Sequence, residues 1–193
     1  PEPMALVARI VPMASDFAGF GAENARPEHN VACDPIAART VLDSGIPITL
    51  VGLNVTRQTR MTRAEMHRAC GTGTPLARTI TEMHEIWLSF IGTDGSPMHD
   101  PLALAYTFRP DLLTVVPTHT RLREDLAEAG CIEFNPPVNG SVTHVTAATE
   151  VNAAAFQSLL HERLRQAVSH TEDSRERDRA RDHRGLHGLA KEI

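Results

Sequence analysis

The feature that most constrains the fold is a compact apolar run, Ile48-Thr49-Leu50-Val51-Gly52-Leu53, which follows Pro47 and gives way to polar residues after Val55. An apolar run of this length without polar alternation is typical of a strand buried on both faces, as in a parallel sheet. Residues 112–116 and 142–147 are further strand candidates. Because these runs alternate with helical patterns, the sequence predicts an α/β fold with a mostly parallel sheet flanked by helices.

Helix signals lie between the strand candidates. Asp34-Pro35 combines an N-cap residue with a first-turn proline, and Gly45 ends the helix that they begin. Residues 75–91 predict a long amphipathic helix, residues 4–11 predict a short helix, and a further helix is predicted over residues 152–168. The large apolar side chains that share one side of the long helix are Leu76, Ile80, Met83, Trp87 and Phe90.

Composition and charge exclude several classes of protein. The 193 residues are 41% hydrophobic and carry a net charge of −5, which favours a folded domain without a basic field for nucleic acid. No apolar run approaches the roughly 20 residues that span a bilayer, and no signal peptide is visible. We therefore expect no nucleic acid partner and no membrane partner.

The cysteines and the charged end of the chain complete this outline. Cys33, Cys70 and Cys131 are odd in number and widely spaced, so we interpret each as a small buried hydrophobe in a reducing, cytoplasmic protein. Residues 169–193 interleave acidic and basic side chains and contain little that is apolar. They predict a charged, solvated helix or tail after a domain over residues 1–168.

The first candidate site is a polar cluster over residues 23–30, in a loop just before the Asp34 helix. Glu28 and Asn30 are two residues apart, so in an extended segment their side chains point the same way. A carboxylate beside an amide can accept and donate hydrogen bonds to a diol. The alternative is a polar surface loop in which Asn24 occupies a turn.

The second candidate site is Met98-His99-Asp100-Pro101. An imidazole at a junction between a loop and a helix can face a cleft and donate a proton near neutral pH. Two alternatives stay open. His99 could be a structural histidine, and Asp100 could be a plain helix cap like Asp34, since both precede a proline.

Several motifs together resemble the C-terminal half of the inosine-uridine preferring nucleoside hydrolases, over about residues 4–168. In chain order they are Glu28-His29-Asn30, Asp34-Pro35-Ile36-Ala37-Ala38, Ser44-Gly45-Ile46-Pro47-Ile48-Thr49 and Met98-His99-Asp100-Pro101-Leu102-Ala103. The resemblance implies a nucleoside-hydrolase-like α/β fold whose N-terminal half is missing. The implied activity is hydrolysis of the N-glycosidic bond of a ribonucleoside, which gives ribose and a free base.

The resemblance also implies residue roles. His99 would help to protonate the departing base, and Asp100 would be a ligand of a calcium ion that holds the ribose hydroxyls and the attacking water. Glu28, Asn30 and Asn24 would bind ribose hydroxyls. A ribonucleoside is thus the implied partner, and a homo-oligomer is expected because dimers and tetramers are usual in the family.

The chain departs from the family pattern at several positions. The aspartate-rich D-x-D-x-x-x-D-D motif is absent from the sequence, and Asn54 and Arg57 stand where the family usually has Asp and His. We therefore expect weak activity or none from this chain alone. The alternative function is that of a catalytically degenerate family member that acts as a binding or oligomerisation protein.

Overall fold

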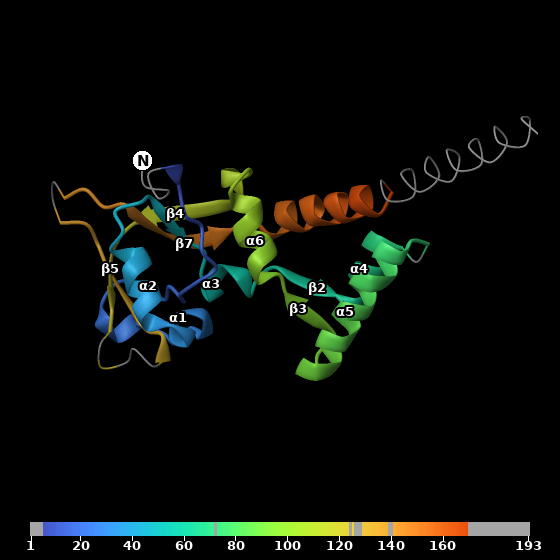
Figure 1. The fold of residues 1–193 in the computed structure, drawn as a ribbon, viewed down its shortest axis with the longest axis horizontal. Coiled ribbons are helices and arrows are strands. Elements are labelled where there is room, and N and C mark those ends of the chain that lie inside the picture. Colours follow the sequence, from blue (N-terminus) through green and yellow to red (C-terminus); the bar gives the residue numbers. More distant parts are fainter. Residues whose placement is uncertain (1–5, 72, 124, 126–128, 139–140, 170–193) are drawn as a thin grey trace, which may run out of the picture. The chain divides into compact units, whose positions relative to one another are not determined.

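A computed structural model describes residues 6–71, 73–123, 125, 129–138 and 141–169. The chain forms two compact units, each made of two segments (Figure 1). The first unit comprises Pro1–Arg60 and Pro97–Phe156, and the second comprises Met61–Ser96 and Gln157–Ile193. Among the described residues, no helix is long and apolar enough to cross a membrane.

The main sheet of the first unit has the strand order β1-β7-β4, formed by Ile48–Leu50, Val145–Val151 and Leu113–Pro117. β1 is parallel to β7, whereas β4 is antiparallel to β7. The α/β class is confirmed, and the sheet is mixed: β1 and β7 are parallel, as expected, whereas the antiparallel β4 departs from the expectation of a mostly parallel sheet. An apolar run indicates a buried strand without encoding its direction, and among the described residues between β4 and β7 there is no crossover helix.

Residues 7–11 are not helical, where a helix over residues 4–11 was expected. Ile10 and Met13 form parallel bridges with Ile48 and Val51, so this segment continues the sheet beyond β1. Residues 7–11 contain no helix, and residues 1–5 lie outside the described part of the chain. Short apolar runs do not by themselves distinguish a helix from a strand, and here the pairing with β1 decides.

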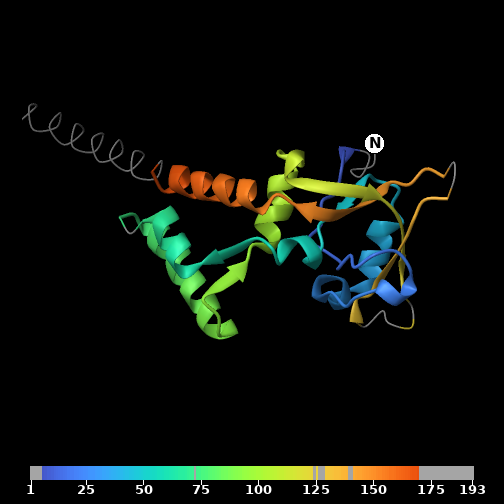
Figure 2. The same cartoon turned by 180° about the vertical axis from the view of Figure 1, so that it is seen from behind.

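The remaining elements of the first unit surround this sheet. α1 (His29–Cys33) and α2 (Pro35–Leu42) precede β1, and α3 (Leu53–Thr56) follows it. The antiparallel strands β5 (His119–Leu122) and β6 (Ile132–Asn135) lie against α2, as the view from behind in Figure 2 also shows. Before β4 in the chain come α6 (His99–Tyr106) and the 3-10 helix η3 (Pro110–Leu112), and another 3-10 helix, η2 (Ala22–Asn24), precedes α1. A buried core cluster joins α1, α2, β1, β5, β6 and β7 through Val31, Leu42, Ile48, Leu50, Leu122, Ile132, Phe134, Val145 and Ala147.

The second unit is largely helical. The short strands β2 (Arg60–Thr62) and β3 (Gly95–Pro97) pair, and α4 (Arg63–Cys70) packs on α5 (Pro75–Ile91). α5 has the predicted bounds, but it buries Ala77, Thr81, His84 and Leu88. The predicted apolar side is instead the outer one, with Met83 65%, Trp87 50% and Phe90 80% exposed. The apolar periodicity of residues 75–91 predicted the helix but did not predict which of its sides is buried.

The end of the described chain is a helix over residues 153–169, close to the predicted 152–168. Asn152 begins it, because its side chain accepts a hydrogen bond from the backbone N–H of Ala155 at 3.1 Å. Residues 170–193 lie outside the described residues, so the charged tail stays a prediction. The three cysteines are free, but Cys33 is exposed, so only Cys70 and Cys131 are the buried hydrophobes that were expected.

Candidate functional site

The candidate site lies at one edge of the main sheet in the first unit. The chain near Ile10, β1 and β7 run in the same direction, so all three end at this edge. Loops at the carboxyl edge of parallel strands commonly bind ligands. Three hydrogen bonds tie these loops together: Leu53 N to Ser15 O at 2.9 Å, Phe17 N to Asn54 Oδ1 at 3.3 Å and Asn54 Nδ2 to Ala148 O at 2.8 Å.

Glu28 is buried at this edge, where it is the N-cap of α1. Its Oε1 accepts from Asn30 N at 2.9 Å, and its Oε2 accepts from Val31 N at 3.0 Å and Ser15 N at 3.3 Å. A side chain at Gly130 would collide with the carbonyl of Glu28, so a glycine permits this close approach. An ionised carboxylate has about four lone-pair positions, and three are engaged by backbone N–H groups.

Asn30 and Asn24 make separate hydrogen bonds, and Asn30 does not lie in the extended segment that was expected. Asn30 lies inside α1, so the extended geometry expected for Glu28 and Asn30 is wrong, because Glu28 caps a helix that starts at His29. The Asn30 amide donates to the carbonyl of Met13 at 3.0 Å, which keeps it at the sheet edge. Asn24 donates to the carbonyl of Phe20 at 2.7 Å. Within the described residues, no hydrogen bond links Asn24 to Glu28 or to Asn30.

His99 is partly buried at the first residue of α6. Its Nδ1 lies 2.7 Å from the hydroxyl of Thr56, at the end of α3. Burial lowers the pKa of His99, the negative charges of Asp100 and Glu28 oppose that shift, and the cation of Arg57 adds to it. The imidazole is therefore within electrostatic reach of carboxylates from both sequence-predicted clusters, which the fold brings to the same edge.

The two Asp-Pro pairs have different structures. Asp34 is the N-cap of α2, and its Oδ1 accepts from Ala37 N at 2.9 Å, as expected. Asp100 is not a cap, because α6 begins at His99 and its N-cap is Met98. The Asp100 side chain is exposed, and it makes no hydrogen bond with any other residue that the structure describes. The helix-cap interpretation of Asp100 is therefore wrong, and its carboxylate is available to a ligand.

Arg57 adds a positive charge next to His99. Its guanidinium contacts the carboxylate of Asp16 at 2.9 Å, and 58% of the Arg57 side chain is exposed. This pair connects the loop after Met13 to the end of α3. An exposed ion pair contributes only about 0–1 kcal/mol to stability, so its main consequence here is the electrostatic field at the imidazole.

Ser15 and Thr56 are parts of this edge that sequence reasoning missed. Ser15 has a φ of 77°, in the left-handed region that residues other than glycine rarely adopt, and its buried hydroxyl has no partner among the described residues. Thr56 is fully buried beneath His99. The sequence signal that could have found both residues was their position, because Ser15 follows the segment near Ile10 and Thr56 follows β1, and both segments pair in parallel within the sheet.

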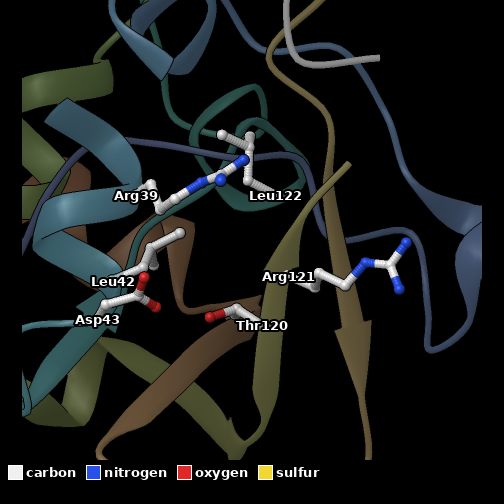
Figure 3. A pocket seen from close by; sticks show the side chains of 6 residues that line it. All are labelled: Arg39, Leu42, Asp43, Thr120, Arg121 and Leu122. Atoms are coloured by element: carbon white, nitrogen blue, oxygen red, sulfur yellow. The ribbon is translucent and has the colours of Figure 1, made fainter. Parts of the chain in front are cut away.

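Two surface hollows of the first unit adjoin the core. One has a volume of about 240 Å³ and is mostly apolar, and Asn30 lies in its wall together with Met13, Val41 and Ile132. The other, of about 410 Å³, lies between α2 and β5. In Figure 3 the oxygens of Asp43 and Thr120 face each other across it, and the guanidinium of Arg121 points away. None of the sequence-predicted site residues lines this second hollow.

Comparison with known proteins identifies the family. The profile of the inosine-uridine preferring nucleoside hydrolases matches residues 1–158. A pyrimidine-specific ribonucleoside hydrolase RihA from Enterobacter sp. (strain 638) is 30% identical over 173 residues, which cover 86% of this chain and 55% of that protein. RihA from Klebsiella pneumoniae (strain 342) is 29% identical over 171 residues, which cover 85% of this chain and 55% of that protein. The chain belongs to the inosine-uridine preferring nucleoside hydrolase family.

Solved structures agree with this assignment. A purine-preferring ribonucleoside hydrolase from Gardnerella vaginalis superposes with a TM-score of 0.72 at 26% identity, over 83% of this chain and 52% of that one. A plant nucleoside hydrolase, at 24% identity and a TM-score of 0.66, shares the fold over 81% of this chain and 53% of that one. The chain thus spans about half the length of the relatives that it matches.

The described residues do not by themselves fit the calcium ion that the family implies. Calcium takes six to eight oxygen ligands, usually from several carboxylates. Within the described part of the chain, no group of three or more His, Cys, Asp or Glu side chains could hold a metal ion. Asp100 has a free carboxylate, whereas Glu28 is engaged by backbone N–H groups.

Proposed function

We propose that this chain carries part of the active site of a ribonucleoside hydrolase, which cleaves the N-glycosidic bond to give ribose and a free base. The observation that carries the proposal is the arrangement at the start of α6. There the partly buried His99, and Asp100 whose side chain makes no capping hydrogen bond, lie at the same edge of the sheet as Glu28. Family membership supports the reaction type, and the base preference stays open, since relatives named pyrimidine-specific and purine-preferring both match.

The proposed roles follow from the geometry of each side chain. His99 faces the leaving base and donates a hydrogen to it, because an N-glycosidic bond breaks more easily when the departing base is not left as an anion. Glu28 has about one lone-pair position left for a ribose hydroxyl, and Asn30 supplies an amide at the same edge. The Glu28 carboxylate and the Asn30 amide stabilise the oxocarbenium-like transition state of the sugar.

Asp100 and Asn24 complete the proposed set. We retain Asp100 as a ligand of calcium whose other ligands come from outside the described residues, and Asn24 as a ribose contact. The proposal also retains a cytoplasmic setting and a homo-oligomer. Since the chain spans about half of its relatives, we expect weak turnover or none from the chain alone.

A sensitive assay of base release tests the proposal. We expect slow release of base from inosine or uridine with added calcium, reduced about 10²- to 10⁴-fold in His99→Ala, which is the usual contribution of a proton-donating side chain. His29→Ala is the matched control, because His29 is an exposed histidine in α1. Equal rates in wild type and His99→Ala would contradict the role of His99.

The second candidate function is that of a degenerate binding protein, which the engagement of Glu28 by three backbone N–H groups favours. Calorimetry with calcium and ribose separates the two functions. Binding without base release would favour the binding protein, whereas neither binding nor release at millimolar ligand would contradict both.

A further inference from the structure

The hydrogen bond between Thr56 and His99 determines where the imidazole carries its proton. The Thr56 side chain has no exposure to solvent, and its hydroxyl lies 2.7 Å from His99 Nδ1. Within the described residues, the Thr56 hydroxyl has no other hydrogen-bond partner. In contrast, the hydroxyls of Thr40 in α2 and Thr81 in α5 donate to carbonyls one turn back in their own helices.

A buried hydroxyl with one neighbour must direct its proton to that neighbour, because an unsatisfied buried donor costs about 1–3 kcal/mol. The Thr56 hydroxyl therefore donates to His99 Nδ1, and Nδ1 acts as the acceptor. In a neutral imidazole one nitrogen accepts and the other donates, so the proton of His99 is on Nε2.

We propose that Thr56 is a positioning residue, which fixes neutral His99 as the Nε2–H tautomer and so presents an N–H donor on the ring edge away from α3. The chemical partner of that donor is an acceptor atom of the nucleobase, a ring nitrogen or a carbonyl oxygen. This last assignment rests on the proposed function, whereas the tautomer itself does not. A donor held by the fold needs no rearrangement when charge develops on the departing base.

The test is a long-range ¹H–¹⁵N NMR spectrum of the full chain at pH 8, where the imidazole is neutral, with His99 assigned by its loss in His99→Asn. We expect the signals of an unmixed Nε2–H tautomer, a hydrogen-bonded Nδ1 and a slowly exchanging Thr56 hydroxyl proton. Thr56→Val should move the Nδ1 resonance to that of a nitrogen without a hydrogen bond, and Thr56→Ser should restore it.

Thr59→Val is the matched control, because Thr59 is equally buried but its hydroxyl donates to the Thr56 carbonyl at 2.8 Å and not to the ring. This variant should leave the His99 signals unchanged. A wild-type proton on Nδ1, or an Nδ1 resonance unmoved in Thr56→Val, would overturn the inference. If Thr56→Val does not fold, the wild-type spectrum alone decides, and an absence of base release would count against the proposed function but not against the tautomer.

Discussion

The beginnings of α1 and α2 differ from the beginning of α6 in what their carboxylates do. Glu28 and Asp34 each cap a helix, so their oxygens accept hydrogen bonds from the backbone. Asp100 precedes a proline just as Asp34 does, yet it lies two residues beyond the N-cap of α6, Met98, and its carboxylate makes no hydrogen bond among the described residues. The Asp-Pro dipeptide thus caps a helix at α2, whereas at α6 it leaves a carboxylate that a ligand can contact.

Among the substitutions that compare the helix starts, the largest effect on ligand binding or base release should come from Asp100→Asn. If Asp100 contacts a charged or polar ligand group, its loss removes about 1.5–3 kcal/mol, which lowers ligand affinity or base release by about ten- to a hundred-fold. The free energy of unfolding should stay within about 0.5 kcal/mol of wild type, since the carboxylate makes no hydrogen bond in the described chain. Calorimetry and thermal melting measure the two quantities, and a large loss of stability would place Asp100 among the structural carboxylates.

Glu28→Gln should be the most destabilising of the carboxylate changes. An amide cannot accept all three N–H bonds that Glu28 accepts, so we expect a loss of about 2 kcal/mol in urea unfolding. Glu23→Gln is the control, because Glu23 is exposed in the same loop and should cost little. Similar stabilities of the two variants would refute the capping role of Glu28.

Asp34→Ala should cost about 1 kcal/mol, the usual value of an N-cap side chain. Asp100→Ala is its matched partner, with the same Asp-Pro context but no capping bond, and should cost less than about 0.5 kcal/mol. The two variants can be compared by chemical denaturation under one condition. Equal costs would remove the distinction between the helix starts.

Ser15→Gly should stabilise the protein by about 1 kcal/mol. Glycine adopts a positive φ without steric cost, and the substitution also removes a buried hydroxyl that lacks a partner within the described structure. Ser15→Ala removes only the hydroxyl and should gain less. Both keep the backbone N–H that Ser15 donates to Glu28, so a destabilised Ser15→Gly would mean that the hydroxyl itself supports the α1 start.

The smallest effect should be a pH-dependent loosening of α6. Burial lowers the pKa of His99 below its ordinary 6.5, so the folded state resists protonation more than the unfolded state does. This contribution to stability is complete above pH 6.5 and is lost as the pH falls below it.

Amide hydrogen exchange at pH 7.5 and 5.5, corrected for intrinsic rates, measures that loosening. At pH 5.5 the protection of the Leu102 amide, which donates to Met98 O, should fall more than that of the Ala38 amide, which donates to Asp34 O. His99→Asn should abolish the difference. An equal loss of protection at both helices in wild type would contradict the assignment.

Sequence patterns predicted local structure better than packing. The buried parallel strand from Ile48, the Asp34 cap and the bounds of α5 were confirmed, because each depends on a local signal such as apolar composition, capping or a first-turn proline. The strand is shorter than the apolar run, since β1 ends at Leu50 and α3 begins at Leu53. The direction of β4 and the buried side of α5 were not predictable in this way. Both depend on which other elements pack against them.

The candidate site shows the same limit. Glu28, His99 and Asp100 stood out as polar groups beside helix starts, but their meeting at one edge depends on strands that are far apart in the sequence. Thr56 carries no motif of its own and gains its importance only from a hydrogen bond to a residue 43 positions later. The Asp-Pro pattern alone could not distinguish Asp100 from Asp34 before their helix starts were known, and only the family resemblance assigned them different roles.

The most direct test of the account is an NMR titration of the ¹⁵N-labelled chain with inosine. The account predicts that the backbone amides of Ser15, Asn30, Thr56 and Asp100 shift together, whereas those of Ala37 and Ala38 at the α2 start stay in place. Shifts confined to α2, or no shift at any of these amides at millimolar inosine, would contradict the claim that the α6 start is the one that meets the ligand.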